Sequence, residues 1–329
     1  MKYFDQSRRQ FGSHCILGLG LLSTFNQVAT AAAYPSKVVR VVVPFPSGGG
    51  TEVIGRSLIQ AMAEDLGQAM IIDNKPGAGT VIGSDFVAKA ANDGHTLLMT
   101  TGALAINASL VANLPYDTLS DFVPIGRVCN GPNVIAVRAD SPIKSLADLI
   151  RMTKERKNLL SYASSGNGSA VHLAAELFKM MAKIDIQHIP YKGGGPAYTD
   201  LLGGHVDMVF ATVGGVSKFL KNGQMRAIAL TSSYRVNSYP GLPTISETIP
   251  GYSAEVWYGL FAPKGTPPAI VERLNLALSK AANQHKYKEM LINDGLTVSV
   301  NTPSEMSVFF KSEVDRWRSV VASQKIQSD

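Results

Sequence analysis

Residues 38–51 read VVRVVVPFPSGGGT, and this stretch decides the predicted fold. Val38–Val43 is a run of β-branched side chains around Arg40 that ends at Pro44, which is typical of a buried strand in a parallel sheet. After the glycines, apolar residues recur at helical spacing from Thr51 to Asp65. A strand, a helix and a strand are then predicted at Ile71-Ile72, Val81–Ala91 and Thr96–Thr100. This alternation predicts the α/β class, with a parallel sheet and helices on both of its faces.

The alternation continues after residue 120. Further strands are predicted at Phe122–Val128, Val134–Val137, Leu159–Tyr162, Ile186–Ile189, Val206–Phe210, Ala227–Thr231 and Val256–Ala262. Asn130-Gly131-Pro132 predicts a turn between the first two of these strands. Thr302-Pro303 predicts the start of a long last helix, because proline is favoured at the first helical position.

Length and composition restrict the class of protein. With 329 residues and 45% hydrophobic side chains, the chain is long enough for two domains with buried cores. Only 17% of the residues are charged, and the net charge of +6 is dispersed along the chain. Nucleic-acid binding is therefore not expected. Two cysteines cannot form a disulfide framework or a four-cysteine zinc site, and the six histidines stand apart. We expect neither a metal nor a cofactor.

Residues 1–33 have the pattern of a secretory signal peptide. The pattern consists of basic residues at Lys2, Arg8 and Arg9, a short apolar stretch at Cys15–Leu22, and small residues for cleavage at Ala31-Ala32-Ala33. The apolar stretch is far shorter than the ~20 residues that span a bilayer. The general secretory route and the twin-arginine route both stay open. Cleavage near Ala33 predicts a periplasmic protein, in which Cys129 is the remaining cysteine and a core residue.

Glycine-rich turns recur where predicted strands end and helices begin. They are Pro44–Thr51, Asn74–Thr80, Tyr162–Ser169 and Pro190–Pro196. Glycine allows positive φ and close approach of a ligand, and the free N–H groups and dipole of a helix start favour an anion. Open α/β sheets bind ligands at this edge. The turns predict a site for a small anion, with Phe45, Tyr162 and Tyr191 either as its walls or as packing residues.

Motifs for phosphate-bearing cofactors and for nucleophilic catalysis are missing. None of the turns fits G-x-x-x-x-G-K-[ST], Gly77–Gly83 has one residue too many for G-x-G-x-x-G, and no G-x-S-x-G occurs. We predict no catalytic residue and interpret His172 as a structural histidine. The alternative is a secreted hydrolase or lyase that acts on a small carboxylic acid. It requires a serine or cysteine within hydrogen-bond reach of His172 or His188.

Six motifs occur in an order that resembles one family. They are Val43–Arg56, Asn74–Gly79, Tyr162–Ser169 followed by His172-Leu173-Ala174, Pro190–Ala197, Leu201–Asp207 and Trp257–Pro263. From Tyr34 onward the chain resembles the Bordetella-uptake-type solute-binding proteins, the extracytoplasmic receptors of tripartite tricarboxylate transporters. The resemblance implies a monomeric binding protein that is not an enzyme, with a small carboxylate as ligand and membrane permease subunits as partners. A third possibility is a receptor that binds the same ligand and docks on a periplasmic sensor protein in place of a permease.

The resemblance also implies a two-lobed periplasmic-binding-protein fold of the type II, Venus-flytrap kind. Two strands are expected to cross between the lobes, near Asn133 and near Glu255. Lobe 1 is then residues 34–133 plus 255–329, and lobe 2 is residues 134–254. The ligand is expected in the cleft between them.

Matching the motifs residue by residue implies the ligand contacts. On lobe 1 they are Phe45, Ser47, Gly49, Gly50, Ala78, Gly79, Thr80, Thr101, Ala103, Leu104 and Asn107. On lobe 2 they are Ser164, Ser165, Gly168, Ser169, Tyr191 and Asp207. Members of the family hold a carboxylate mainly through backbone amides, hydroxyls and water, which agrees with the glycine turns.

Three positions depart from the family pattern. Glu52 stands where aspartate is usual, Gly55 stands where alanine is usual, and Leu104 stands where a more polar residue is common. A longer acid could displace a bridging water, and an apolar contact could admit a larger, flatter ligand. We therefore expect a di- or tricarboxylate, plain or aromatic such as terephthalate, in preference to an amino acid.

Overall fold

The computed structural model describes residues 34–48, 50–155 and 160–324. The compact unit that it defines begins at Tyr34, whose hydroxyl donates a hydrogen bond to the Gly94 carbonyl at 2.7 Å. The predicted signal peptide, residues 1–33, lies outside the described residues, and so does Gly49. Within the described ranges, no helix combines the length and the apolar character needed to cross a bilayer.

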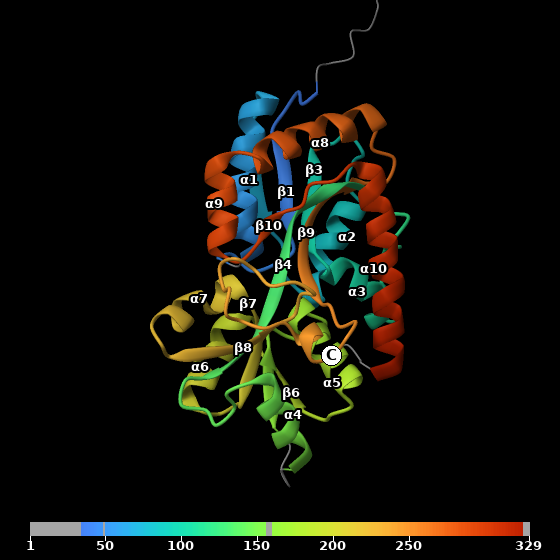
Figure 1. The fold of residues 1–329 in the computed structure, drawn as a ribbon. Coiled ribbons are helices and arrows are strands. Elements are labelled where there is room, and N and C mark those ends of the chain that lie inside the picture. The colour runs from blue at the N-terminus through green and yellow to red at the C-terminus, as the bar shows by residue number, and fades with distance from the viewer. Residues whose placement is uncertain (1–33, 49, 156–159, 325–329) are drawn as a thin grey trace, which may run out of the picture. The chain divides into compact units, whose positions relative to one another are not determined.

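The first half of the chain forms the predicted succession of strands and helices (Figure 1). Its elements are β1 (Val39–Val43), α1 (Gly50–Leu66), β2 (Met70–Asn74), η1 (Ala78–Thr80), α2 (Val81–Ala88), β3 (Thr96–Thr101) and α3 (Ala103–Leu110). β1 lies between β2 and β3 and is parallel to both. All the valines of β1 are fully buried, while Arg40 is exposed. The β-branched run therefore marks a strand covered on both faces, as predicted.

The strand β4 (Phe122–Arg138) is 17 residues long and belongs to both halves of the sheet. Its first half pairs antiparallel with β9 (Glu255–Pro263), up to the pair Pro132–Glu255. From Asn133 onward it pairs with β7 (Met208–Thr212) and β8 (Met225–Leu230). The predicted turn at Asn130-Gly131-Pro132 is therefore wrong, because pairing with β9 keeps these residues extended. Residue 131 has to be glycine because the backbone at Gly295 approaches it closely. A Cβ on Gly131 would lie 2.7 Å from the Gly295 carbonyl oxygen.

A second set of strands and helices surrounds the other half of β4. Its elements are α4 (Leu146–Glu155), β5 (Ser161–Ser164), α5 (Ala170–Ala182), β6 (Gln187–Pro190), α6 (Gly194–Gly203), β7, α7 (Val213–Lys221), β8 and η2 (Ile245–Glu247). β5 is parallel to β6 and to β7. The strand order is β2-β1-β3-β9-β4-β7-β5-β6, so the antiparallel pair β9–β4 joins two parallel regions. The two-lobed α/β fold expected from the sequence is confirmed.

The C-terminal segment returns to the first set of elements. α8 (Pro268–Ala282) and α9 (His285–Asn293) pack on α1, and α10 (Pro303–Gln324) lies along α3 (Figure 1). Thr302 and Glu305 form a capping box at the start of α10, which confirms the predicted helix start. Between α9 and α10, the short strand β10 (Thr297–Val298) pairs with β4 at Asn130 and Cys129.

Hydrophobic side chains fill the space between the sheet and its helices. One cluster lies between β1 and the helices α1, α8 and α9, and it contains Leu58, Leu274 and Cys129. Cys129 is fully buried, so the prediction of a core cysteine is confirmed. Another cluster includes Phe210 and Trp257 and extends to α5 and α10. Since both faces of the sheet are covered, the carboxyl ends of its parallel strands are left to form a site.

Candidate functional site

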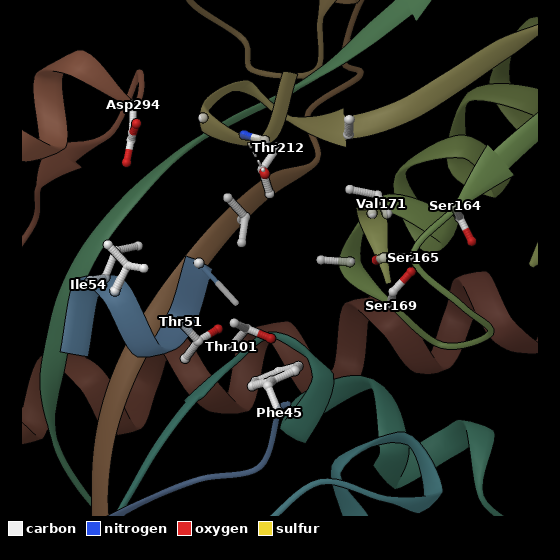
Figure 2. A pocket seen from close by; sticks show the side chains of 18 of the residues that line it. Phe45, Thr51, Ile54, Thr101, Ser164, Ser165, Ser169, Val171, Thr212 and Asp294 are labelled. Atoms are coloured by element: carbon white, nitrogen blue, oxygen red, sulfur yellow. Dashed lines mark hydrogen bonds between the residues drawn. The ribbon is translucent and has the colours of Figure 1, made fainter. Parts of the chain in front are cut away.

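A cavity of about 480 Å³ lies where parallel strands end and helices begin (Figure 2). Residues at, or directly after, the carboxyl ends of β1, β3, β5 and β7 line it, together with the first residues of α1, α3, α5, α6 and α7. Helix N-termini carry N–H groups without intrahelical partners and a partial positive charge. Five such helix ends around one cavity favour an anionic ligand.

The turn between β1 and α1 contributes Phe45, Gly48, Gly50 and Thr51 to the cavity, and α1 adds Ile54. The phenyl ring of Phe45 and the hydroxyl of Thr51 are seen below the middle of Figure 2. Gly48 has a φ of +81°, a conformation that glycine adopts without strain. This turn therefore supplies an apolar wall, a hydroxyl and a helix N-terminus.

Glu52 holds the same turn in place from within α1. Its carboxylate accepts a hydrogen bond from Gly48 N at 2.7 Å and pairs with Arg56. The hydrogen bonds from Arg56 and Gly48 lower the pKa of Glu52 to about 2, so it is ionised at neutral pH. Glu52 is buried and does not line the cavity. Its extra methylene therefore acts on the shape of the turn and not directly on a ligand.

The turn between β5 and α5 places Ser164, Ser165 and Ser169 on the cavity, and we call these residues the serine end. Ser169 Oγ donates to the Gly166 carbonyl at 2.7 Å and accepts from His172 N at 3.3 Å, so it caps α5. Ser165 is the exposed member of the three. The serine end thus combines a capped helix start with hydroxyl donors.

Two histidines stack behind the serine end. The ring centroids of His172 and His188 are 4.0 Å apart at an interplanar angle of 10°. Nδ1 of His172 accepts a hydrogen bond from Gly168 N at 3.0 Å, and the residue is 3% exposed. Burial lowers the pKa of His172 to about 4, so the ring is neutral at pH 7. The structural role predicted for His172 is confirmed.

Ser164 meets the geometric condition set for the hydrolase alternative. Its Oγ lies 2.7 Å from His188 Nε2, within hydrogen-bond reach. The same oxygen accepts from Gly166 N at 3.1 Å, and Ser164 is 1% exposed. The contact braces the turn, and it is also the arrangement of a nucleophile beside a base.

The opposite end of the cavity combines the start of α7 with the segment after α9 (Figure 2). It consists of Thr212, Gly214, Gly215 and Asp294, and we call it the Asp294 end. Thr212 Oγ1 accepts from Gly215 N at 3.3 Å and caps α7. Asp294 lies against this helix start, since a Cβ on Gly214 would be 2.9 Å from its Cγ. Among the described residues that line the cavity, Asp294 alone is charged.

Tyr198 and Tyr258, which are not among the predicted contacts, also line the cavity. A Cβ on Gly194 or Gly215 would fall 2.5 or 2.4 Å from Tyr198 Oη, so this phenol lies over the starts of α6 and α7. Burial raises the pKa of Tyr198 to about 12. Tyr258 of β9 is 4% exposed, and its hydroxyl makes no hydrogen bond to any residue that the structure describes. Both phenols remain protonated and can donate.

The structure brings seven of the predicted contacts together on the cavity. They are Phe45, Gly50, Thr101, Ala103, Ser164, Ser165 and Ser169. Nine others do not line it: Ser47, Ala78, Gly79, Thr80, Leu104, Asn107, Gly168, Tyr191 and Asp207. Gly49 lies outside the described residues. For all of these positions, a ligand contact stays a prediction.

Several residues outside the lining have structural partners. Asn107 Nδ2 donates to the Gly79 carbonyl at 2.9 Å and to Thr80 Oγ1 at 3.1 Å, which ties the start of α2 to α3. Leu104 is fully buried in the core. Tyr191 Oη donates to the Asp200 carboxylate at 2.6 Å.

Asp207 lies at the other edge of the sheet from the cavity. Its carboxylate accepts hydrogen bonds from Ser161 N at 2.8 Å and from Ser161 Oγ at 3.0 Å. Ser161 begins β5 and Asp207 directly precedes β7, whereas the cavity lies where both strands end.

The unpredicted lining residues differ in the sequence signal they carry. Thr212-Val213-Gly214-Gly215 follows a strand and opens a helix, so it has the chemistry of the other glycine turns and could have been found in the same way. Asp294 and Tyr258 carry no comparable signal, because tertiary contacts bring them to the cavity. Within the described ranges, no group of three or more histidine, cysteine, aspartate or glutamate side chains is placed to hold a metal ion.

Residues 54–326 match the family model of the tripartite tricarboxylate transporter family receptor. Protein BugT of Bordetella pertussis is 37% identical over 295 residues, which are 89% of this chain and 90% of BugT. The solved structure of R. palustris Rpa4515 with adipate has a TM-score of 0.83 and 33% identity, and the match covers 89% of this chain and 99% of that one. MatC from Rhodopseudomonas palustris with bound malate has a TM-score of 0.80 and 32% identity, with coverage of 88% and 100%.

Fold and cavity together define a two-lobed solute-binding protein of the periplasmic type. The chain belongs to the tripartite tricarboxylate transporter receptor family, in which it resembles the Bug proteins. The family resemblance noted in the sequence is therefore confirmed.

Proposed function

We propose that the protein captures a small organic carboxylate in the cavity and delivers it to membrane permease subunits of a tripartite transporter. The observation that carries the proposal is the convergence of the N-termini of α1, α3, α5, α6 and α7 on one cavity. No lysine or arginine occurs among the described lining residues, so backbone N–H groups and hydroxyls are the groups left to bind an anion.

The available donors suit a carboxylate. Thr51, Thr101 and Ser165 add hydroxyls to the helix N-termini. A hydrogen bond to a charged group contributes about 1.5–3 kcal/mol, so two or three such bonds can hold one carboxylate without a cationic side chain. The adipate and malate bound by the two relatives support this chemical class. The calorimetric panel described below tests the expected preference for a di- or tricarboxylate, because it contains malate, adipate, terephthalate and citrate.

We propose that the lobes close around the ligand at crossings near Asn133 and Glu255, with lobe 1 at 34–133 plus 255–329 and lobe 2 at 134–254. The change of partner of β4 at these residues supports the boundary. Thr231 links the two crossings: its Oγ1 accepts from Asn133 N at 2.8 Å and donates to the Ala254 carbonyl at 2.6 Å. Rotation about a few element-terminal residues is the usual form of hinge closure.

We propose that the protein works in the periplasm as a monomer after removal of residues 1–33, by either export route. The hydrogen bond of Tyr34 to Gly94 supports a folded chain that starts at this residue. Delivery to a permease and docking on a periplasmic sensor use the same ligand site. Loss of uptake of the identified ligand on deletion of the gene, with the sensor response intact, would support the permease.

Isothermal titration calorimetry of the mature protein, freed of co-purified ligand by partial unfolding and refolding, tests the proposal. The panel contains acetate, hexanoate, malate, adipate, terephthalate and citrate, with glucose and hexylamine as controls without a carboxylate. We expect saturable binding of at least one acid, weakened by Ser165→Ala and unchanged by Ser307→Ala, a control at an exposed position on α10. Absence of heat with every acid would overturn the proposal.

The contact between Ser164 and His188 favours a second candidate function, a hydrolase. Turnover of p-nitrophenyl acetate and p-nitrophenyl butyrate by wild type and by Ser164→Ala separates the two functions. A receptor gives equal background rates for both proteins. A rate that falls by about 10³-fold or more in Ser164→Ala would instead identify Ser164 as a nucleophile.

A further inference from the structure

Asp294 is the residue in the cavity that a purely anion-binding site leaves unexplained. It is the one charged residue among the described lining residues, and its charge has the same sign as a carboxylate ligand. It follows α9 and reaches the cavity because β10, three residues later, pairs with β4. It lines the cavity, and Figure 2 shows its side chain on the far side from the serine end.

The Asp294 carboxylate has no hydrogen-bond or ion-pair partner among the residues that the structure describes. Burial raises its pKa, and Lys221 at the other end of α7 acts in the opposite direction. The phenol of Tyr258, on β9, is the other titratable group that interacts with it. The Asp294 oxygens are not among the buried atoms that lack a partner, so water can reach them in the open cavity. A ligand that displaces this water has to supply a hydrogen bond in its place, or the carboxylate is left without a donor.

Asp294 also changes what the helix ends offer. Its Cγ would lie 2.9 Å from a Cβ on Gly214, so its carboxylate occupies the space beside the start of α7. The partial positive charge of that helix end is therefore offset by a protein carboxylate. The starts of α1, α3, α5 and α6 remain for the carboxylate of a ligand, and α5 begins at the serine end.

We propose that Asp294 selects ligands that carry a carboxylate at one end and a hydrogen-bond donor, best an ammonium group, at the other. The carboxylate binds toward the serine end and the donor binds Asp294. The apolar side chains of Ile54, Val171 and Val256 line the cavity as well and suit an aliphatic or aromatic linker. This inference rests on the proposed carboxylate-binding function and narrows it to a substrate class.

A second carboxylate at the Asp294 end would face a like charge in a partly buried site, which disfavours ionisation of both groups. The sequence-based preference for a di- or tricarboxylate relied on Glu52 and Leu104. Neither residue lines the cavity, whereas Asp294 does. The lining therefore favours an amino carboxylate over a dicarboxylate of equal length.

Calorimetry with matched ligands tests the inference. The aliphatic set is hexanoate, adipate and 6-aminohexanoate, and the aromatic set is benzoate, terephthalate and 4-(aminomethyl)benzoate. We expect the amino compound of at least one set to bind wild type about tenfold or more tighter than the dicarboxylate of that set. In Asp294→Asn, the amino compound should weaken and the dicarboxylate should strengthen, while the monocarboxylate changes little. Asp185→Asn is the control, because it removes the same charge at an exposed position that does not line the cavity. It should leave all three affinities unchanged.

The possible results separate the inference from the function on which it rests. If dicarboxylates bind wild type tighter than the amino compounds in both sets, the inference fails and the carboxylate receptor stands. If no acid of either set or of the wider panel binds, both fail. If Asp294→Asn does not fold, the order of affinities in wild type decides alone, and Asp294→Ser provides a second neutral variant.

Discussion

The two ends of the cavity are built in different ways. The serine end comes from one turn of six residues, Ser164–Ser169, which hydrogen bonds to Gly166 and His172 hold in shape. The Asp294 end joins two segments that are 79 residues apart, counted from Gly215 to Asp294, and its carboxylate has no partner within the described residues. One end is thus completed by the protein, whereas the other is left for a ligand to complete.

This difference indicates that the serine end provides a rigid binding surface for a carboxylate and that the Asp294 end determines which ligands are preferred. A turn whose hydroxyls and N–H groups are already ordered binds a carboxylate at a low entropic cost, because few groups must be immobilised. An unpaired carboxylate contributes little to general affinity but discriminates between ligand end groups. Variants at the serine end should therefore alter the affinity for all acids, with a loss of stability where the changed residue also holds the turn or caps α5, and variants at the Asp294 end should alter the order of ligands.

The largest effect is expected from Gly168→Ala, which changes the serine end. Gly168 has a φ of +71°, and a Cβ there would lie 2.3 Å from Leu110 Cδ2. Left-handed backbone strain and overpacking together should lower the free energy of unfolding by about 2–5 kcal/mol. Denaturant titration measures this loss, and Gly241→Ala, where a Cβ meets nothing within 4 Å, is the matched control. Equal midpoints for the two variants would contradict the strain argument.

Acid should destabilise the serine end through His172. Burial lowers the folded-state pKa of His172 to about 4, below the ordinary value of 6.5. Between these values the unfolded chain binds more protons than the folded one, so stability falls as the pH drops from about 6.5 to about 4. The total loss is about 3 kcal/mol for a shift of this size.

Thermal denaturation of wild type and His172→Gln over this pH range measures the effect. The variant should lack this part of the pH dependence, while His285→Gln, at a highly exposed histidine, should keep it. A wild-type slope that survives in His172→Gln would assign the effect to another group.

The serines should separate affinity from stability. Ser165→Ala removes an exposed hydroxyl of the cavity and should weaken acid binding by about 1–2 kcal/mol with an unchanged melting temperature. Ser169→Ala removes the N-cap of α5 as well and should also cost about 1 kcal/mol of stability. Calorimetry and thermal denaturation of both variants test the distinction, and unchanged affinity would move either serine out of the site.

The smallest effect is expected from Tyr258→Phe. The Tyr258 hydroxyl has no partner among the described residues, so its removal should leave the free energy of unfolding nearly unchanged. If it donates to the ligand, affinity should fall by about 0.5–1.5 kcal/mol. Tyr252→Phe is the contrasting control, because the Tyr252 hydroxyl donates to the Ala174 carbonyl within the core and its loss should reduce stability instead.

Local chemistry made the serine end predictable. The alternation of strands and glycine turns identified the sheet edge, and Ser164, Ser165, Ser169, Phe45 and Gly50 do lie on one cavity there. The same reasoning applied to Thr212-Val213-Gly214-Gly215 would have added the start of α7. These features depend on residues close in sequence, which a single sequence displays directly.

Tertiary contacts decided what the sequence alone could not. Asn130-Gly131-Pro132 has the composition of a turn, but pairing with β9 keeps it in a strand. Asp207 was predicted at the site, and the structure places it away from the cavity, where its carboxylate binds Ser161 at the other end of the strands. Asp294 reaches the cavity only because β10 pairs with β4, and nothing near it in sequence indicates that pairing.

The attachment of β10 has a mechanical consequence. β10 pairs with β4 at Cys129 and Asn130, within a few residues of the point where β4 changes partners from β9 to β7. For a rotation about the proposed crossing at Asn133, a group fixed near the axis travels a short arc and one far from it travels a long arc. Asp294 is on such a short lever arm. Its carboxylate therefore stays at nearly the same position before and after closure, so it can contact the end group of a ligand in both states.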